Sequence, residues 1–459
     1  MRYVFTLDTL EYLVKEGRVN KTIGPFLSDL KHVRNKRCTS LLKFITAFLL
    51  AIFMMVSVAP TTFAEDASSK EPQIRGEGAY LIDVLSGQTL YMKNPDKPLA
   101  PASTTKIMTG LLAIERGNLN DIVTASSSML NNKLVYGTQI YLGPGERMPL
   151  KDLLYALLLN SANDAAVAIA EHVGSDLPNF VEMMNQRARE IGANQTHFLN
   201  SSGLTETGHI TTAHDLALIA RVAYQNPTFA EYVRTKSQTI SRTKPDIPTL
   251  MVNENKLLWR DSTVDGIKTG YTAAAQNCLV TSVTKDGRQF IGVILKSPGR
   301  EIYTDMQAMF EFGFTQFKET IFKPSGSIIS TIMVNNEPVD LILDRPIYMT
   351  QKLDEQSSVL NLRVIPTSSS PLSSVKEGQV VAQVEILDGN TLVSTLPLKS
   401  SRTIFPHTLK SSVRSNYLFL ITGFMLMGVV LSLLIGQKIY ADRRWRKQMR
   451  LTRRRESNP

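Results

Sequence analysis

The sequence predicts an α+β protein in three parts: a mixed helix and strand domain, a small all-β domain and a C-terminal transmembrane helix. Helical and strand-like hydrophobic patterns mix over residues 78–317, and short strand-like runs separated by turns occupy residues 322–400. Residues 417–435 then form a run of nineteen residues without a charge. A chain of 459 residues is also too long for one hydrophobic core, which agrees with several domains.

Hydrophobic spacing predicts the individual elements of the two domains. Leucines at three- and four-residue intervals indicate a helix at residues 150–159, for example, and the turn at 86–88 indicates a hairpin. In the first domain we expect strands at 80–84 and 89–92, helices at 106–114, 150–159 and 164–173, and strands at 278–283 and 289–295. In the second we expect strands at 327–334, 339–343, 359–364 and 380–386. A polar tether at 65–77 and a polar linker at 401–416 flank the two domains.

The net charge of +10 is concentrated at the two ends of the chain. Residues 1–43 carry nine Lys or Arg and four Asp or Glu, and residues 436–459 carry nine and two. The region between them has 33 basic and 35 acidic side chains, a net charge of −2. A nucleic-acid footprint needs a positive face on the folded part. We therefore expect no nucleic-acid partner.

The N-terminal leader, residues 1–64, predicts export. An uncharged apolar run at 44–59 follows several basic residues and precedes the small residues Thr62 and Ala64, which is typical of a secretory signal peptide cleaved after Ala64. A retained N-terminal anchor is the alternative, although the run is short for a span. Residues 1–30 are unusual before a signal peptide, whose basic region is brief, so we expect that translation starts further downstream.

The uncharged run at 417–435 predicts a membrane span. As a helix it would be about 28 Å long, close to the hydrocarbon thickness of a bilayer. The basic tail at 436–459 follows it, and basic flanks stay in the cytoplasm, so residues 65–416 should lie outside the cell membrane. The flanking charge disfavours the alternative, a buried core helix. The tail should also touch anionic membrane lipid.

Most candidate nucleophiles and ligands can be set aside. Signal removal would leave Cys278 as the one cysteine, which excludes an internal disulfide, and its apolar strand-like surroundings indicate a small buried hydrophobe. The histidines form no metal signature, and no Gly-rich phosphate loop is present. We therefore expect no metal and no organic cofactor.

A serine can also be activated by a lysine one helical turn away, because a desolvated amine can take the hydroxyl proton. Six Ser-x-x-Lys patterns occur in the chain, and only Ser103-x-x-Lys106 opens an apolar helix. Alone, Ser103 would be interpreted as a helix N-cap. Two further motifs change that interpretation: Ser161-Ala162-Asn163 at a helix break, and Lys268-Thr269-Gly270 on a strand-like run. The three together mark penicillin-binding proteins and class A β-lactamases.

At these motifs the sequence resembles the D-alanyl-D-alanine carboxypeptidases, the low-molecular-mass penicillin-binding proteins of serine peptidase family S11. The resemblance covers about residues 75–317, including 142–146 and 265–272, and more weakly the β domain. It implies a serine β-lactamase/DD-peptidase-like domain, an antiparallel sheet with flanking helices and a helical subdomain. Two features depart from the family. Gln276-Asn277 stands where a Gly is frequent, and the chain crosses the membrane where familiar members end in a helix that lies on it.

The resemblance also implies a reaction and a set of roles. Such enzymes remove the terminal D-Ala from peptidoglycan stem peptides through an acyl-enzyme, and penicillins acylate and inhibit them. The implied roles are: Ser103 as nucleophile, Lys106 as base, Ser161 as proton relay, Asn163 to hold the substrate amide and orient Lys106, Lys268, Thr269 and Gly270 to bind the substrate with its free carboxylate, Arg300 beside that carboxylate, and N–H groups of Ser103 and Tyr271 or Thr272 as the oxyanion hole.

Other functions stay open on the sequence. A β-lactamase would need a deacylating Glu with an Asn four residues on, whereas Glu182 and Asn185 have a different spacing, so slow release of penicillin is expected. The β domain and the span also argue against a β-lactamase. A transpeptidase or endopeptidase of the same fold would carry the same motifs. A non-catalytic, membrane-tethered wall-binding protein is the alternative from another class.

Overall fold

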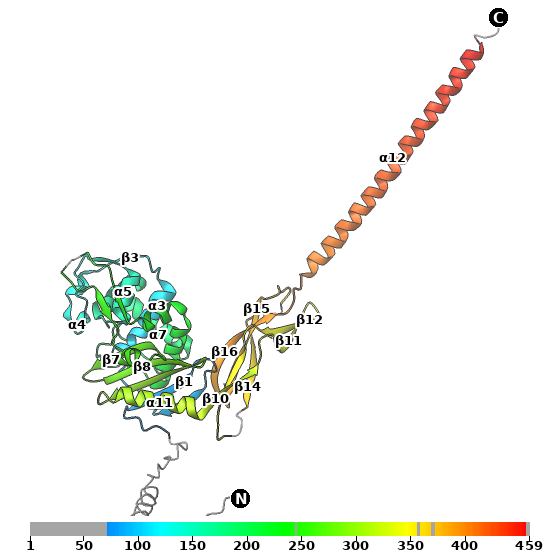
Figure 1. Cartoon of the computed structure of the whole chain (residues 1–459). Coiled ribbons are helices and arrows are strands. Elements are labelled where there is room, and N and C mark those ends of the chain that lie inside the picture. The colour runs from blue at the N-terminus through cyan, green and yellow to red at the C-terminus, as the bar shows by residue number, and fades with distance from the viewer. Residues whose placement is uncertain (1–70, 244–245, 356–358, 369–371, 456–459) are drawn as a thin grey trace, which may run out of the picture. The chain divides into compact units, whose positions relative to one another are not determined.

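The computed structural model describes residues 71–455 except 244–245, 356–358 and 369–371, and omits the side chains of 407–416 and 451–455. The predicted signal peptide and the start of the predicted tether lie outside the described residues. The described part contains the three predicted kinds of structure, namely a sheet with helices, a β region and a long C-terminal helix (Figure 1). The predicted α+β class is confirmed.

A five-stranded antiparallel sheet forms the centre of the first part. Its strands are β1 (Gly78–Asp83), β2 (Thr89–Lys93), β7 (Val264–Thr272), β8 (Gln276–Lys285) and β9 (Arg288–Ser297), in the spatial order β2-β1-β9-β8-β7. The N-terminal hairpin thus completes a sheet whose other strands lie about 180 residues later, because β1 pairs with β9 from Gly78 opposite Leu295 to Asp83 opposite Phe290. Both faces of the sheet are buried, so the alternating side chains of β1 enter two different cores.

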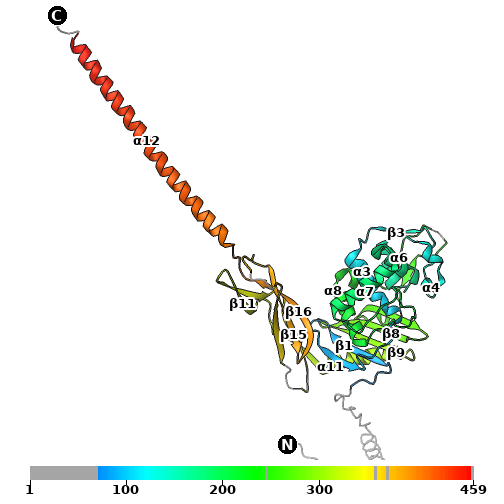
Figure 2. The ribbon, with the colours of Figure 1, turned by 180° about the vertical axis from the view of Figure 1, so that it is seen from behind.

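Helices cover the two faces of this sheet. Helix α11 (Ile302–Gln316) packs through Met306, Met309 and Phe310 against one face, while α3 (Lys106–Arg116) and α8 (Ala213–Gln225) contribute to the core on the other (Figure 2). The helical part beyond α3 is made of α5 (Leu150–Leu158), α6 (Asn163–Gly174), α7 (Leu177–Ile191) and α9 (Pro227–Arg234). The shorter elements are η2 (Ala102–Thr105), β3 (Ile122–Thr124), η3 (Ser127–Leu130), α4 (Asn132–Val135), β4 (Arg147–Pro149), β5 (Ser237–Thr239), β6 (Leu250–Val252) and α10 (Lys256–Arg260).

The β region follows α11 directly. It contains β10 (Phe317–Lys323), β11 (Ile328–Val334), β12 (Glu337–Leu343), β13 (Ile347–Lys352), β14 (Leu360–Pro366), β15 (Val380–Asp388) and β16 (Thr391–Ser400). Five strands pair in the order β11-β12-β16-β15-β14, and β10 pairs with β13. Their inward side chains, among them Val339, Leu341 and Val384, form a separate apolar core. Sequence reasoning missed β10, β13 and β16, because their polar positions break the apolar pattern.

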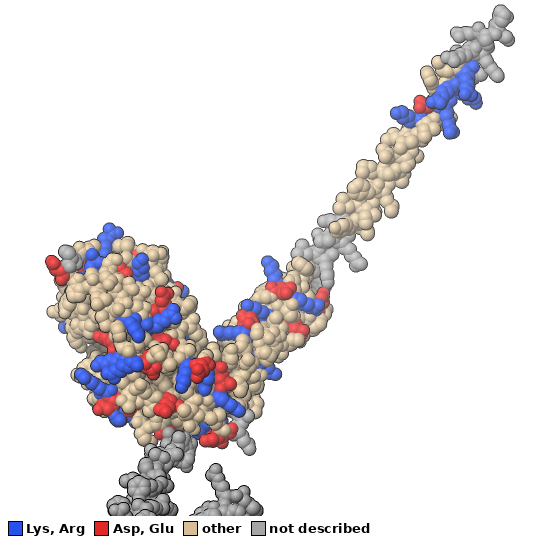
Figure 3. Space-filling view, viewed as in Figure 1, with Lys and Arg blue, Asp and Glu red and all other residues tan. Residues whose placement is uncertain are grey.

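The chain continues into a single long helix, α12 (His407–Arg455), of 49 residues. At 1.5 Å per residue the helix is about 74 Å long. It begins at His407, inside the predicted polar linker 401–416. Among the described residues, one helix is long and apolar enough to cross a membrane, within Tyr417–Arg450 at a mean hydropathy of 2.6. Its apolar side chains are exposed, and Figure 3 shows basic side chains gathered beyond them.

Candidate active site

The reactive pair of the candidate site lies where a short 3-10 turn leads into α3. Ser103 is half-buried in η2, and Lys106 is the first residue of α3. The Nζ atom of Lys106 lies 3.0 Å from the Oγ atom of Ser103. No side-chain capping bond is recorded for Ser103. The N-cap interpretation is therefore replaced by a direct contact between the serine hydroxyl and a lysine.

Lys106 is completely buried, and its other contacts are neutral oxygen atoms. Its Nζ donates to Oδ1 of Asn163 at 2.6 Å and to the carbonyl oxygen of Ser202 at 2.7 Å. A neutral amine has two hydrogens and one lone pair. It can donate to these two oxygens and still accept a proton from the Ser103 hydroxyl. The contacts of Lys106 therefore suit the unprotonated form.

Burial also favours the unprotonated form of Lys106. Desolvation lowers the pKa of Lys106 well below its ordinary value, and the positive charge of Lys268 lowers it further, while Glu254 and Asp164 oppose the shift. Desolvation is the largest cause of the pKa shift, because the charged form of a buried amine has no water around it. A lysine whose pKa is lowered in this way loses its proton at a lower pH than a free lysine does, and the neutral amine can take the hydroxyl proton as the serine attacks.

Asn163 is fixed by the break between α5 and α6. Ser161 has φ +62°, a left-handed conformation that turns the chain sharply before α6 begins at Asn163. The Asn163 side chain donates to the carbonyl oxygen of Tyr136 at 2.5 Å, which leaves its Oδ1 for Lys106. The next residue, Asp164, accepts N–H bonds from Ile140 and Leu142 and so holds the facing loop. Ser161 itself is buried, and the structure records no hydrogen bond of its hydroxyl with a described residue.

The third motif lies on the edge strand β7, beside the turn that carries Ser103. A Cβ atom placed on Gly270 would lie 2.9 Å from the backbone nitrogen of Ser103 and 3.1 Å from that of Thr104. Only a glycine permits this approach. Lys268, two residues earlier, is almost fully buried, and its Nζ donates to the carbonyl oxygen of Thr269 at 3.2 Å. The three sequence motifs thus meet at one place in the fold.

The remaining predicted residues are less closely tied to this place. Tyr271 is exposed, and the Thr272 hydroxyl accepts from the N–H group of Ala275. Arg300 is exposed in the turn between β9 and α11, and no ion pair of its guanidinium with the described residues is recorded. The roles predicted for Tyr271, Thr272 and Arg300 therefore stay predictions.

Two groups at the site were missed by the sequence reasoning. The carbonyl oxygen of Ser202 binds Lys106, and the carboxylate of Glu254 lies 3.8 Å from Nζ of Lys268 and accepts from Oγ1 of Thr269 at 3.1 Å. Neither belongs to a motif with chemistry of its own. No pattern in the sequence marks either group, and the burial of Asn253 and Asn255 on either side of Glu254 is seen only in the structure.

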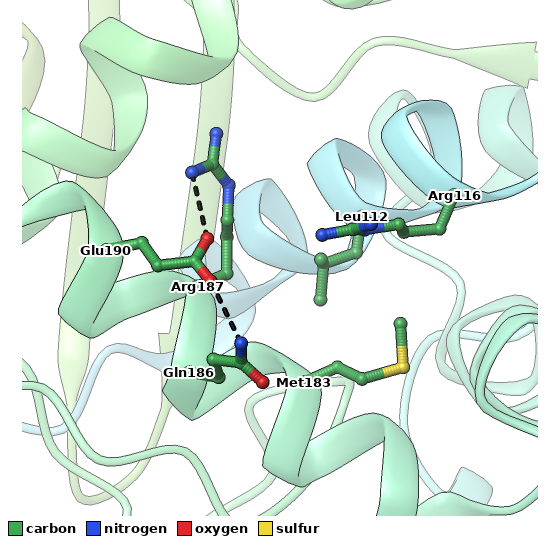
Figure 4. Close-up of a pocket in the computed structure, with 6 residues that line it drawn as sticks. All are labelled: Leu112, Arg116, Met183, Gln186, Arg187 and Glu190. Carbon is green, nitrogen blue, oxygen red and sulfur yellow. Dashed lines mark hydrogen bonds and ion pairs between the residues drawn. The ribbon is translucent and has the colours of Figure 1, made fainter. Parts of the chain in front are cut away.

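Other candidates for chemistry lie elsewhere or are unsuited. Burial raises the pKa of the Cys278 thiol to about 12, so its thiolate is strongly disfavoured. Within the described ranges no three His, Cys, Asp or Glu side chains gather as metal ligands. A cavity of about 320 Å³ between α3 and α7 is lined by Leu112, Arg116, Met183, Gln186, Arg187 and Glu190, with Glu190 bonded to Gln186 and Arg187 (Figure 4). It includes none of the predicted site residues.

Comparison with known proteins identifies the class. The family model of the D-alanyl-D-alanine carboxypeptidases, peptidase S11, matches residues 65–299. The chain is 31% identical to the D-alanyl-D-alanine carboxypeptidase DacF of Bacillus subtilis, over 74% of this chain and 92% of that protein. It is 29% identical to DacC of Escherichia coli, over 77% and 90% of the two chains.

Solved structures agree with these matches. Penicillin binding protein 5 of Haemophilus influenzae has a TM-score of 0.58 and 27% identity, over 73% of this chain and 99% of that one. The Streptomyces K15 DD-transpeptidase has a TM-score of 0.50 and 32% identity, over 54% and 99%. Fold and matches together define a serine-type hydrolase. The chain belongs to the D-alanyl-D-alanine carboxypeptidase family, peptidase S11, and the predicted D-Ala-D-Ala carboxypeptidase function is confirmed.

Proposed function

We propose that this carboxypeptidase trims the terminal D-alanine from peptidoglycan stem peptides with Ser103 as nucleophile and Lys106 as general base. The observation that carries the proposal is the buried amine of Lys106, 3.0 Å from the Ser103 hydroxyl and held by two neutral oxygens. The proton of Ser103 passes to Lys106 as Oγ attacks the carbonyl carbon between the two D-Ala residues. The carbonyl oxygen then carries the developing negative charge.

The remaining steps use the other residues of the three motifs. The N–H groups of Ser103 and of Tyr271 or Thr272 stabilise the oxyanion, and one such donor contributes about 3 kcal/mol. The C–N bond breaks as Ser161 relays a proton to the leaving amine of D-alanine. Water then attacks the acyl-enzyme and releases the shortened peptide. Each step uses protein side chains and water alone, so the mechanism requires no metal and no organic cofactor.

Substrate ends are selected by their free carboxylate. Lys268 and Thr269 bind it, with Arg300 nearby, while Asn163 and the backbone at Gly270 hold the peptide. Lys268 is buried, so an ion pair with it is only weakly screened by water. A peptide that lacks a carboxylate at this position cannot form this ion pair, which favours trimming of ends over cleavage within a chain.

Penicillins acylate the same serine, and the resulting acyl-enzyme is hydrolysed slowly. Asn185, which sequence analysis compared with a deacylating pair, donates to the carbonyl oxygen of Phe198 and accepts from its N–H group inside the helical part. Glu182 forms an exposed ion pair with Arg189. Both residues are thus engaged in structural contacts. We therefore expect inhibition by penicillin and no efficient β-lactamase activity.

The enzyme works from the membrane. Residues 417–435 of α12 span the bilayer once, with the region before them outside and the basic tail, residues 436–459, in the cytoplasm against anionic lipid. The exposed apolar surface of the helix and the basic residues beyond it support this topology. The export signal at 1–64 would deliver the chain to this side of the membrane.

One experiment tests the reaction and the nucleophile together. The full chain in detergent is labelled with fluorescent penicillin and the modified peptide is mapped by mass, while D-alanine release from a pentapeptide is measured. We expect label on Ser103 and D-alanine release, both lost in Ser103→Ala. Label on another residue, or D-alanine release by the folded Ser103→Ala variant, would contradict the proposal.

Transpeptidation is the second candidate, since the chain is similar to a DD-transpeptidase of known structure. Hydrolysis and transpeptidation share the acyl-enzyme and differ in the acceptor, water or an amine. Adding an amine acceptor such as glycylglycine to the pentapeptide assay separates them. A carboxypeptidase yields mainly the tetrapeptide at millimolar acceptor, whereas a transpeptidase yields mainly the aminolysis product.

A further inference from the structure

A carboxylate of the protein lies beside the groups proposed to bind the carboxylate of the substrate. One oxygen of Glu254, Oε2, accepts from Oγ1 of Thr269 at 3.1 Å and lies 3.8 Å from Nζ of Lys268. Within the described residues, Glu254 is the sole acidic side chain recorded in an ion pair with Lys268 or Lys106. It therefore supplies the counter-charge for the buried Lys268.

The backbone around Glu254 is held firmly by its two neighbours. Asn253 is buried and donates to the carbonyl oxygens of Val233 and Thr235, at 3.0 and 3.1 Å. Asn255 is buried and donates to the carbonyl oxygen of Gly266 in β7 at 3.0 Å. The amide of Glu254 itself donates to the carbonyl oxygen of Leu159 at 3.3 Å. The position of Glu254 is thus built into the fold, while its side chain is 43% exposed at the edge of the site.

The carboxylates of Glu254 and of the substrate compete for the same hydrogen-bond donor. A threonine hydroxyl has a single hydrogen to donate, and Thr269 gives it to Glu254. A substrate carboxylate can receive it only if Glu254 gives it up. The two carboxylates would also share the single positive charge of Lys268, and like charges at such distances repel each other. Binding of the substrate therefore requires an exchange.

We propose that Glu254 occupies the carboxylate subsite of the free enzyme as an internal counter-ion, which the terminal carboxylate of a peptide or penicillin must replace. This inference rests on the proposed function, because it takes Lys268 and Thr269 as the groups that bind that carboxylate. Glu254 is then a specificity-determining residue. It weakens the binding of every ligand that carries the carboxylate and leaves ligands without one unaffected.

The test compares two ligands that differ only in the carboxylate, benzylpenicillin and its methyl ester. Second-order rate constants for acylation are measured on the full chain in detergent, for the wild type, Glu254→Gln and Glu254→Ala. Glu254→Gln keeps an acceptor for Thr269 and removes the charge. A partly exposed charge interaction contributes up to about 1 kcal/mol, so acylation by the acid should rise by about threefold to fivefold. The ester rate should change by less than about twofold.

Glu231→Gln is the matched control, because Glu231 is an exposed glutamate on α9 that forms no recorded ion pair with Lys106 or Lys268. It should change neither rate. An unchanged or lowered acid-to-ester ratio in Glu254→Gln and Glu254→Ala would overturn the inference. Thermal melting curves report whether the variants are folded.

Failure of this inference can be distinguished from failure of the proposed function. If the wild type releases D-alanine and is labelled at Ser103 while the ratio stays constant, the role of Glu254 alone is wrong. If the wild type shows neither D-alanine release nor label at Ser103, the proposed function fails, and the inference that rests on it is overturned too.

Discussion

The catalytic region, from β1 to α11, and the β region, from β10 to β16, differ in the polarity of the side chains that they bury. The catalytic region buries Lys106, Lys268, Asn163 and Asp164 with many other polar side chains. Among the described residues of the β region, the buried polar side chains are Thr350 and Ser400. Burying an amine costs free energy that apolar packing does not. The buried polar groups of the catalytic region therefore lower its stability and provide its reactivity. Substitutions there should mainly change the acylation rate, whereas substitutions in the β region should mainly change the free energy of unfolding.

The comparison is tested most strongly by Lys106→Met, which replaces the buried amine by an apolar chain of similar length. Loss of a general base should lower the penicillin acylation rate by about 10²- to 10⁴-fold. The free energy of unfolding should change by less than about 2 kcal/mol, because relief of desolvation offsets three lost hydrogen bonds. Stopped-flow acylation and thermal melting measure the two quantities. Acylation at the wild-type rate would rule out Lys106 as the base.

The pH dependence of acylation also tests whether Lys106 is the general base. Protonated Lys106 cannot accept the serine proton, so the rate should fall about tenfold per pH unit below its lowered pKa. Lys268, Glu254 and Asp164 are the charged groups that influence this pKa, and none of them has to change its charge for the effect to appear. Rates measured from pH 5 to 10 should show this limb in the wild type. A flat profile would contradict a lysine base.

Lys106 should make the stability of the protein rise with pH, as any group does whose pKa is lower in the folded than in the unfolded chain. The folded pKa of Lys106 lies below its ordinary value of 10.5, so between the two the unfolded chain binds a proton that the folded chain does not. The contribution of Lys106 to stability therefore rises with pH across this window and is smallest below it. Chemical denaturation at several pH values, with Lys106→Met as the reference, measures the difference.

In the β region the expected effect is on stability alone. Leu341 is fully buried in the core of this region, and Leu341→Ala should lower the free energy of unfolding by about 2–5 kcal/mol. Below the melting temperature the acylation rate should stay within about twofold of the wild type. Denaturation and acylation of the same preparation measure both quantities. A large loss of rate in the folded variant would show that the β region takes part in the reaction.

The smallest effect on the reaction is expected from loss of the C-terminal helix. A chain that ends before Tyr417 lacks the apolar segment and the basic tail. It should acylate with penicillin at the rate of the full chain and leave the membrane fraction. Fractionation of cells followed by labelling tests both expectations. Retention in the membrane would point to a second anchor.

Much of the fold and the site could be predicted from the sequence, and the missing parts have physical reasons. The apolar runs located the strands β8 and β9 and the helices α3, α5 and α6 to within two residues, because most positions of these elements are buried. The motifs at Ser103, Ser161 and Lys268 located the site because their spacing is characteristic. The contributions of Ser202 and Glu254 could not be predicted. A backbone carbonyl leaves no trace in the side-chain pattern, and the role of Glu254 depends on a contact between β7 and a loop.

The tight approach of Gly270 to the turn at Ser103 has an evolutionary consequence. Its missing side chain would meet backbone atoms of Ser103 and Thr104, which cannot step aside as a flexible side chain could. Any substitution of Gly270 by another amino acid would displace the nucleophile. Under antibiotic selection, resistant forms of this enzyme should therefore keep Gly270 and should change instead at the accessible rim, for example at Tyr271.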